Sequence, residues 1–151
     1  MGRRGVTKIS AGVVSDSMCV EVLELMNDRN NLERATLDDA IAIAAMVHKG
    51  QTDKAGDPYI LHPLRLMMRM SSEPAMIVAV LHDVVEDCRP EDKWTFDRLR
   101  NEGFTDEVVE ALDGVTDREN ESYEAFIERA AANPVSREVK IADLEDNMNL
   151  L

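Results

Sequence analysis

The stretch AVLHDVVED, residues 79–87, carries the strongest indication of both fold and chemistry in this chain. It is an apolar run that the adjacent residues His82 and Asp83 interrupt. Burying an imidazole and a carboxylate without partners costs several kcal/mol. A bound cation would compensate both groups, because imidazole nitrogen and carboxylate oxygen are each competent metal ligands. The stretch therefore indicates an apolar helix that supplies two ligands to a metal ion.

The composition favours helices for the rest of the chain. Its 151 residues fit one domain with a real core. Hydrophobic residues make up 44 % of the sequence but aromatic residues only 4 %, and there are nine methionines. The core must therefore be built from Ala, Val, Ile, Leu and Met, a set that favours helix over sheet.

Capping residues divide the chain into short helices. We expect a flexible arm over residues 1–15 and a domain over residues 16–151 whose first helix is capped by Asp16. The further helices are expected from Thr36 through His48, after Pro63, from Ser72 through Val85 with Pro74 in the first turn, from Thr95 to Gly103, from Thr105 to Gly114, from Ser122 to Asn133, and from Ser136 onward. One all-α domain is the simplest interpretation.

Further polar residues fall on the inward faces of these helices. His48 lies on the apolar face of the helix that begins at Thr36, and Asp143 lies on that of the last helix. Each alone is compatible with an ordinary hydrogen-bonded core side chain. Together with His82 and Asp83 they form a mixed nitrogen and oxygen ligand set that packed helices could bring together. Such a set suits manganese, iron or zinc better than calcium or magnesium.

Two other segments concentrate residues of functional type. Glu86 and Asp87 lie four residues after His82 and Asp83, where they could orient a water or move its proton. The alternative is an acidic helix end that stays in solvent. Tyr59 and His62 follow a turn in the segment 48–63, and for them a local structural role competes with ligand contact.

The charge excludes several classes of partner. The formal net charge of −13 argues against nucleic acids and anionic membranes, whose binding depends on basic surface. No stretch approaches the roughly 18 apolar residues that a transmembrane helix needs. The two cysteines, Cys19 and Cys88, suggest no disulfide framework, so we expect a cytoplasmic protein.

Five ordered motifs carry a family resemblance. They are HKGQ at 48–51, GDPYILHP at 56–63, LHDVVED at 81–87, GVT at 114–116 and KIADLEDNM at 140–148. With these motifs, residues 37–150 resemble the HD-domain metal-dependent phosphohydrolases. More narrowly, they resemble the hydrolase domain of the RelA/SpoT homologues and the small alarmone hydrolases, which act on guanosine tetra- and pentaphosphate.

The resemblance implies a fold, a site and a reaction. It implies an orthogonal helical bundle in which His48, His82, Asp83 and Asp143 bind one manganese ion, and in which Glu86 and Asp87 position or activate the attacking water. The implied reaction removes the 3′-pyrophosphate of the alarmone as an intact diphosphate. The residues expected to contact the nucleotide are Lys49, Lys54, Tyr59, His62, Arg65, Lys140 and Asn147.

The chain also departs from the family pattern. Asp53 replaces a usual arginine, Asp117 replaces a usual lysine, and LEDNMN at 144–149 stands where the family usually has Arg-Leu-His-Asn-Met-Arg. These changes remove cations that would bind phosphate. Two alternatives therefore stay open: hydrolysis of another nucleotide or pyrophosphorylated metabolite, and a nucleotide- or metal-binding module without turnover. The family usually continues with helices beyond the position of Leu151, and a homo-oligomer is compatible with the sequence.

Overall fold

Helix α4 (Glu73–Leu81) lies at the centre of the folded part of the chain. Its buried residues, Ala75 and the run 77–81, point to every side of the helix. A helix that is apolar all round has to be enclosed by its neighbours, and α4 packs against α2 (Leu37–Val47), α3 (Leu61–Met67), α7 (Asp106–Val115) and α9 (Pro134–Asn149). Residues 79–81, the first part of the apolar run 79–87, thus belong to the core helix.

The computed structural model describes residues 20–21 and 34–149, and the chain divides into the units 1–33 and 34–151. The following description concerns the second unit. The arm expected over residues 1–15 and the helix expected after Asp16 lie outside the residues that are described, apart from the short helical segment at 20–21.

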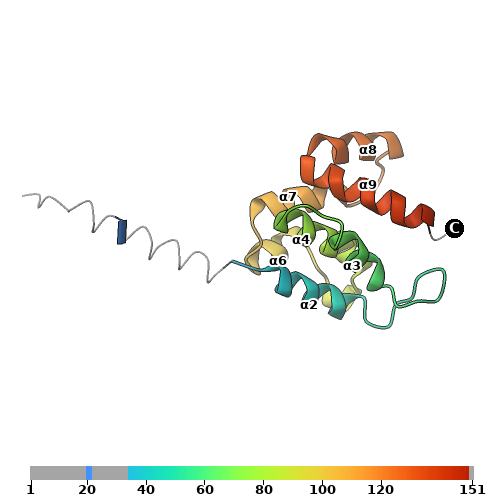
Figure 1. Ribbon diagram of the computed structural model, residues 1–151, viewed down its shortest axis with the longest axis horizontal. Helices are drawn as coiled ribbons and strands as arrows, with labels where there is room; N and C mark the ends of the chain where they lie inside the picture. Colours follow the sequence, from blue (N-terminus) through green and yellow to red (C-terminus); the bar gives the residue numbers. More distant parts are fainter. Residues whose placement is uncertain (1–19, 22–33, 150–151) are drawn as a thin grey trace, which may run out of the picture. The chain divides into compact units, whose positions relative to one another are not determined.

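Over residues 34–149 the regular elements are helices joined by loops (Figure 1). The remaining elements are α5 (Val84–Asp87), a 3₁₀ turn (Pro90–Asp92), α6 (Phe96–Asn101) and α8 (Tyr123–Ala132). Over residues 34–149 the only β-type pairing is an isolated bridge between Thr52 and Pro58. None of the described helices is both long and apolar enough to cross a bilayer. The predicted all-α fold is confirmed.

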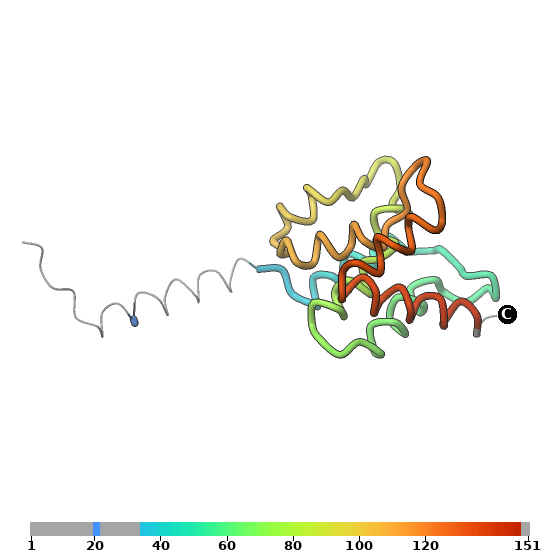
Figure 2. Tube along the Cα trace, turned by 90° about the horizontal axis from the view of Figure 1, so that it is seen from above, coloured from blue at the N-terminus to red at the C-terminus, as the bar shows by residue number. Residues whose placement is uncertain are grey.

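The long C-terminal helix α9 closes the bundle. Figure 2 shows it running alongside the green segments that contain α3 and α4, and it packs on both. This arrangement places residues 140–149 beside residues 59–69 and the end of α4, although these segments are far apart in sequence.

Several helix starts are confirmed at the predicted caps. The Thr36 hydroxyl accepts the Asp39 backbone N–H while the Asp39 side chain accepts the Thr36 N–H, which forms a capping box. The side chains of Ser72, Thr95, Thr105 and Ser122 each accept a backbone N–H three residues further on. These local signals therefore place four further helix N-termini correctly.

Two predicted boundaries between α7 and α9 are wrong. Gly114 does not end α7, which continues to Val115. A Cβ at Gly114 would lie 2.3 Å from Ser136 Oγ, so the glycine allows the two helices to approach closely. Helix α9 starts at Pro134, because Asn133 Oδ1 accepts the N–H groups of Val135 and Ser136 at 2.9 and 3.2 Å. Ser136 instead donates its hydroxyl hydrogen to the carbonyl oxygen of Ala111 at 2.8 Å.

The helix predicted from Ser72 through Val85 is interrupted at His82 and Asp83. Helix α4 ends at Leu81, and α5 begins at Val84. Asp83 has φ −99° and ψ −2°, in the sparsely populated region between helix and strand where active-site residues are often found. The break turns the chain at the point where the two candidate ligands stand.

Candidate metal centre

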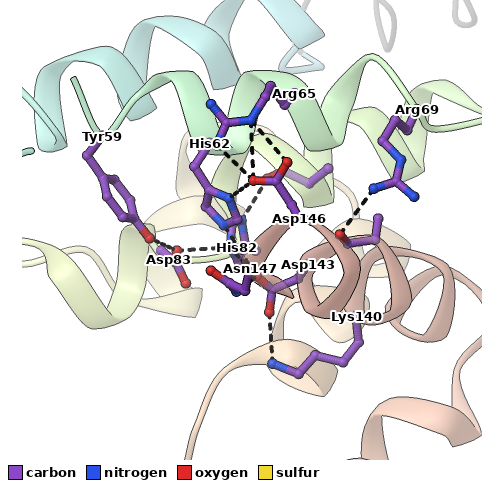
Figure 3. A network of polar contacts seen from close by, with 12 residues as sticks. Tyr59, His62, Arg65, Arg69, His82, Asp83, Lys140, Asp143, Asp146 and Asn147 are labelled. Atoms are coloured by element: carbon purple, nitrogen blue, oxygen red, sulfur yellow. Dashed lines mark hydrogen bonds and ion pairs between the residues drawn. The ribbon is translucent and has the colours of Figure 1, made fainter. Parts of the chain in front are cut away.

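Two imidazoles and two carboxylates from three parts of the bundle converge (Figure 3). The ligand atoms of His62, His82 and Asp83 all lie within 4.8 Å of one another. Asp143 joins them, with Oδ1 3.3 Å from His62 Nε2 and 3.9 Å from His82 Nε2. Helix α3, the break between α4 and α5, and helix α9 each supply part of this cluster, which we call the His–Asp cluster.

Both imidazoles of the His–Asp cluster are held by a hydrogen bond at Nδ1, the ring nitrogen that faces away from the cluster. His82 Nδ1 donates to the carbonyl oxygen of Ala79 at 2.8 Å, and His62 Nδ1 donates to Asp146 at 2.7 Å. A carbonyl or an ionised carboxylate can only accept, so each Nδ1 carries a hydrogen. In the neutral ring the lone pair is then on Nε2, the atom that faces the cluster. This is the orientation that metal-ligating histidines require.

Electrostatics keep the carboxylates of the cluster charged. Burial opposes the charged form of His82, but the carboxylates of Asp83 and Asp143 raise its pKa to about 9. Burial also opposes ionisation of Asp83, and His82 nevertheless lowers the pKa of Asp83. Burial opposes ionisation of Asp143 as well, yet the neighbouring His62 and the charge of His82 lower the pKa of Asp143. The donor set is thus anionic and partly buried, which fits a divalent cation.

His48 does not belong to the His–Asp cluster. It follows the last residue of α2, and its Nδ1 lies 2.9 Å from Gln51 Oε1. Its Nε2 is buried and has no hydrogen-bond partner among the described residues. The ring packs against Tyr59, with the ring centroids 4.9 Å apart. The geometry therefore favours His62 over the predicted His48 as the second imidazole.

Three residues predicted to contact the nucleotide contact the carboxylates of the cluster in this structure. Lys140 Nζ donates to Asp143 Oδ2 at 2.9 Å, and Asn147 Nδ2 donates to Asp143 Oδ1 at 2.7 Å. The Tyr59 hydroxyl donates to Asp83 Oδ2. These contacts fix the direction of both carboxylates in the structure.

The other basic residues expected to contact the nucleotide lie at three different places in the structure. Arg65 forms a two-pronged ion pair with Asp146. Lys54 lines a cavity next to the cluster, whereas Lys49 lines a separate cavity beside Trp94. Asp146 itself was missed as a functional candidate, although as a buried charge among the KIADLEDNM residues it was recognisable as one that needs a partner.

Cavities adjoin the His–Asp cluster on two sides. One of about 390 Å³ includes His82, Asp83, Glu86, Lys140 and Asp143 in its wall. The other, of about 520 Å³, includes Tyr59 and His62, and its remaining lining residues are Thr52, Asp53, Lys54, Leu144, Asn147 and Met148. Together they could accept a ligand that extends across the cluster.

Glu86 and Asp87 lie next to the cluster on α5. Glu86 lines the 390 Å³ cavity, and its Oε1 accepts the backbone N–H of Asp117 at 2.6 Å. Partial desolvation raises the pKa of Glu86, and desolvation together with the negative charge of Asp83 raises the pKa of Asp87. A raised carboxyl pKa favours proton acceptance near neutral pH.

The comparisons with known proteins point to one group. The chain is 32 % identical over 136 residues to a GTP pyrophosphokinase of Streptomyces coelicolor, covering 80 % of this chain and 16 % of the relative. It is 33 % identical over 131 residues to a guanosine-3′,5′-bis(diphosphate) 3′-pyrophosphohydrolase of Vibrio cholerae, covering 76 % and 18 %. A protein with the same name from Borreliella burgdorferi matches at 33 % identity over 92 residues, covering 58 % and 13 %. The chain therefore spans less than a fifth of the length of these curated relatives.

A solved structure supports the same grouping. The fold matches a metazoan ortholog of SpoT, described as hydrolysing ppGpp, with a TM-score of 0.62 and 26 % identity over 76 % of this chain and 69 % of that one. No protein-family model matches the chain. The fold and the relatives define the class as helical HD-domain proteins. Within that class the predicted resemblance is confirmed: this chain is a relative of the SpoT/RelA proteins.

Proposed function

We propose that this protein is a metal-dependent phosphohydrolase that removes the 3′-pyrophosphate from guanosine tetra- or pentaphosphate. The observation that carries the proposal is the His–Asp cluster between two cavities, in a chain related to proteins named for this reaction. Neither feature alone would support it as well, because the fold gives no chemistry and the cluster gives no substrate.

The proposed ligands are His62, His82, Asp83 and Asp143, and the proposed ion is manganese. His62 replaces the earlier expectation of His48, because His62 Nε2 lies 3.3 Å from Asp143 Oδ1 within the cluster, whereas His48 Nδ1 contacts Gln51. A divalent cation bound here would supply Lewis-acid stabilisation of the negative charge on phosphoryl oxygens. Four protein ligands leave room for substrate oxygen atoms on an octahedral ion.

The remaining residues act on the water and on the ligands. Glu86 and Asp87 are proposed to orient the attacking water and accept its proton, a role that their raised pKa values support. Lys140, Asn147 and Tyr59 are proposed to keep the two carboxylates aligned. Lys54 lies in the wall of the larger cavity, where it can contact a phosphate.

A direct assay tests the proposed function. The full chain, loaded with Mn²⁺, should release diphosphate from guanosine tetraphosphate, and Asp83→Ala and His82→Ala should each reduce the rate at least about 100-fold by removing a ligand. Asp97→Ala is the matched control, because it removes an exposed carboxylate on α6. Undiminished turnover in Asp83→Ala, with the fold intact by circular dichroism, would contradict the proposal.

A second candidate function is hydrolysis of a less highly charged nucleotide or pyrophosphorylated metabolite. The 390 Å³ cavity favours it, because Glu86, Asp117 and Glu121 line the wall together with a single lysine, Lys140. A substrate panel distinguishes the two candidates by kcat/KM. Tight nucleotide binding without turnover at full metal occupancy would instead indicate a binding module.

A further inference from the structure

The buried Asp146 and the partly exposed Arg65 form an ion pair directly behind His62. Asp146 is 8 % exposed and accepts from His62 Nδ1 at 2.7 Å. Arg65 Nε donates to Asp146 Oδ1 at 3.0 Å, and Arg65 Nη2 donates to Oδ2 at 2.8 Å. The carboxylate thus lies between an imidazole and a guanidinium that both come from α3, while Asp146 itself comes from α9 (Figure 3).

This arrangement determines the hydrogen position on His62. The two-pronged contact with Arg65 keeps Asp146 ionised, and an ionised carboxylate cannot donate. Asp143 Oδ1 lies 3.3 Å from Nε2, but the 2.7 Å contact between Nδ1 and Asp146 is the shorter of the two, so the hydrogen of a neutral His62 is on Nδ1 and Nε2 is left to bind a cation. The hydrogen bond between His62 Nδ1 and Asp146 also restrains rotation of the His62 ring, so it fixes the plane of the ring.

Asp146 stands at one of the positions where this chain departs from the expected family pattern. The family pattern usually has histidine at the position of Asp146, as part of Arg-Leu-His-Asn-Met-Arg. A histidine there would bring no permanent negative charge to His62. The substitution also explains why Arg65, expected at the nucleotide, is engaged elsewhere.

We propose that Asp146, braced by Arg65, is a positioning residue that holds His62 in its metal-binding tautomer and thereby sets the affinity of the centre for its cation. The inference rests on the proposed assignment of His62 as a ligand. Asp146 touches neither the substrate nor the reacting atoms, so its effect reaches the site through His62 alone.

The neighbouring residue Glu145 supplies a matched control. It forms an ion pair with Arg69, so it links α9 to the turn that follows α3, but that pair is exposed and does not include His62. Removing Glu145 therefore tests the mechanical link between α9 and the segment that contains α3, whereas removing Asp146 tests such a link together with the hydrogen bond to the imidazole.

The test measures Mn²⁺ affinity by calorimetry and the His62 tautomer by ¹⁵N NMR in the full chain. Asp146→Ala should weaken Mn²⁺ binding about 10- to 100-fold and shift the hydrogen of His62 from Nδ1 toward Nε2. Asp146→Asn retains an acceptor oxygen and the residue's size, so it should fold and show a smaller loss. Glu145→Ala should change the affinity less than about threefold, in line with the small effect of an exposed pair.

Three outcomes separate the possibilities. Equal affinities in the wild type and both Asp146 variants would overturn the positioning role while leaving the proposed function intact. Equal losses in Asp146→Ala and Glu145→Ala would overturn it as well, because the helix link would then suffice. A wild type that binds no Mn²⁺ would contradict the proposed function itself. If Asp146→Ala does not fold, Asp146→Asn decides between these results.

Discussion

Individual hydrogen bonds hold the side chains of the proposed ligands in place. His82 is fixed by the carbonyl of Ala79, Asp83 by the Tyr59 hydroxyl, and Asp143 by Lys140 and Asn147. The Ala79 contact lies on the side of His82 that faces away from the cluster, and the Tyr59 contact uses one of the two Asp83 oxygens. Both oxygens of Asp143 accept a hydrogen bond. The ligand side chains are thus already held in place before a cation binds, which favours affinity.

Metal affinity should depend on pH through His82. Its pKa is raised to about 9 by Asp83 and Asp143, so below that pH the ring is protonated and a cation must displace the proton. Mn²⁺ affinity should rise between pH 6 and 8.5, by up to about tenfold per pH unit. Calorimetry in buffers of different ionisation enthalpy should show proton release on binding. An affinity that is constant over this range would contradict the assignment.

The sequence could identify most but not all residues of the site. His82, Asp83 and Asp143 followed from buried polar residues on apolar faces, a signal that helix periodicity carries. The choice between His48 and His62 did not follow, because both flank an irregular loop whose path periodicity does not define. The structure shows that the loop carries Tyr59 onto His48 and that α3 already begins at Leu61, which directs His62 inward. Asp146 was missed because its partners lie on α3, about 80 residues earlier in the chain.

Local capping signals in the sequence predicted where helices start, whereas contacts between distant helices could not be predicted from it. Thr36 and Ser72 marked helix starts because a cap needs only a side chain and a backbone N–H three residues away. Gly114 was taken as a helix end because glycine often follows the last turn. Glycine is needed at position 114 because Ser136 of α9 lies against it. No local sequence pattern contains such a long-range contact.

The α7–α9 contact predicts the effect of Gly114→Ala. Alanine improves helix propensity by about 1 kcal/mol, but its Cβ would lie 2.3 Å from Ser136 Oγ and 2.9 Å from Ser136 Cβ. Overpacking of this kind costs roughly 1–3 kcal/mol, so the free energy of unfolding should fall by up to about 2 kcal/mol. Urea denaturation measures it. Adding Ser136→Gly should make the double variant less unstable than the sum of the single effects; a strictly additive result would argue against the contact.

Across the whole molecule, the cluster joins three parts of the bundle. His62 comes from α3, His82 and Asp83 from the break after α4, and Asp143 from α9, so a cation bound by all four stabilises the folded state over the unfolded one. The net charge of −13 adds self-repulsion that a cation at this anionic site would reduce.

Metal should therefore raise the melting temperature. At a free Mn²⁺ concentration of about 100 times Kd, the linkage contributes about 2.7 kcal/mol, which corresponds to roughly 5–10 °C for a chain of this size. A chelator should reverse the shift, and Asp143→Ala should abolish it. Asp97→Ala should retain it, because Asp97 is an exposed residue of α6 that pairs with Arg100. An equal shift in Asp143→Ala would show that the ion binds elsewhere.

The position of the ion tests the central claim most directly. Anomalous scattering at the manganese edge, from crystals of the full chain grown with Mn²⁺, should give one strong peak bounded by His62 Nε2, His82 Nε2, Asp83 and Asp143, with Asp146 still bonded to His62 Nδ1. A peak coordinated by His48 in place of His62, or peaks only on the acidic surface, would contradict it.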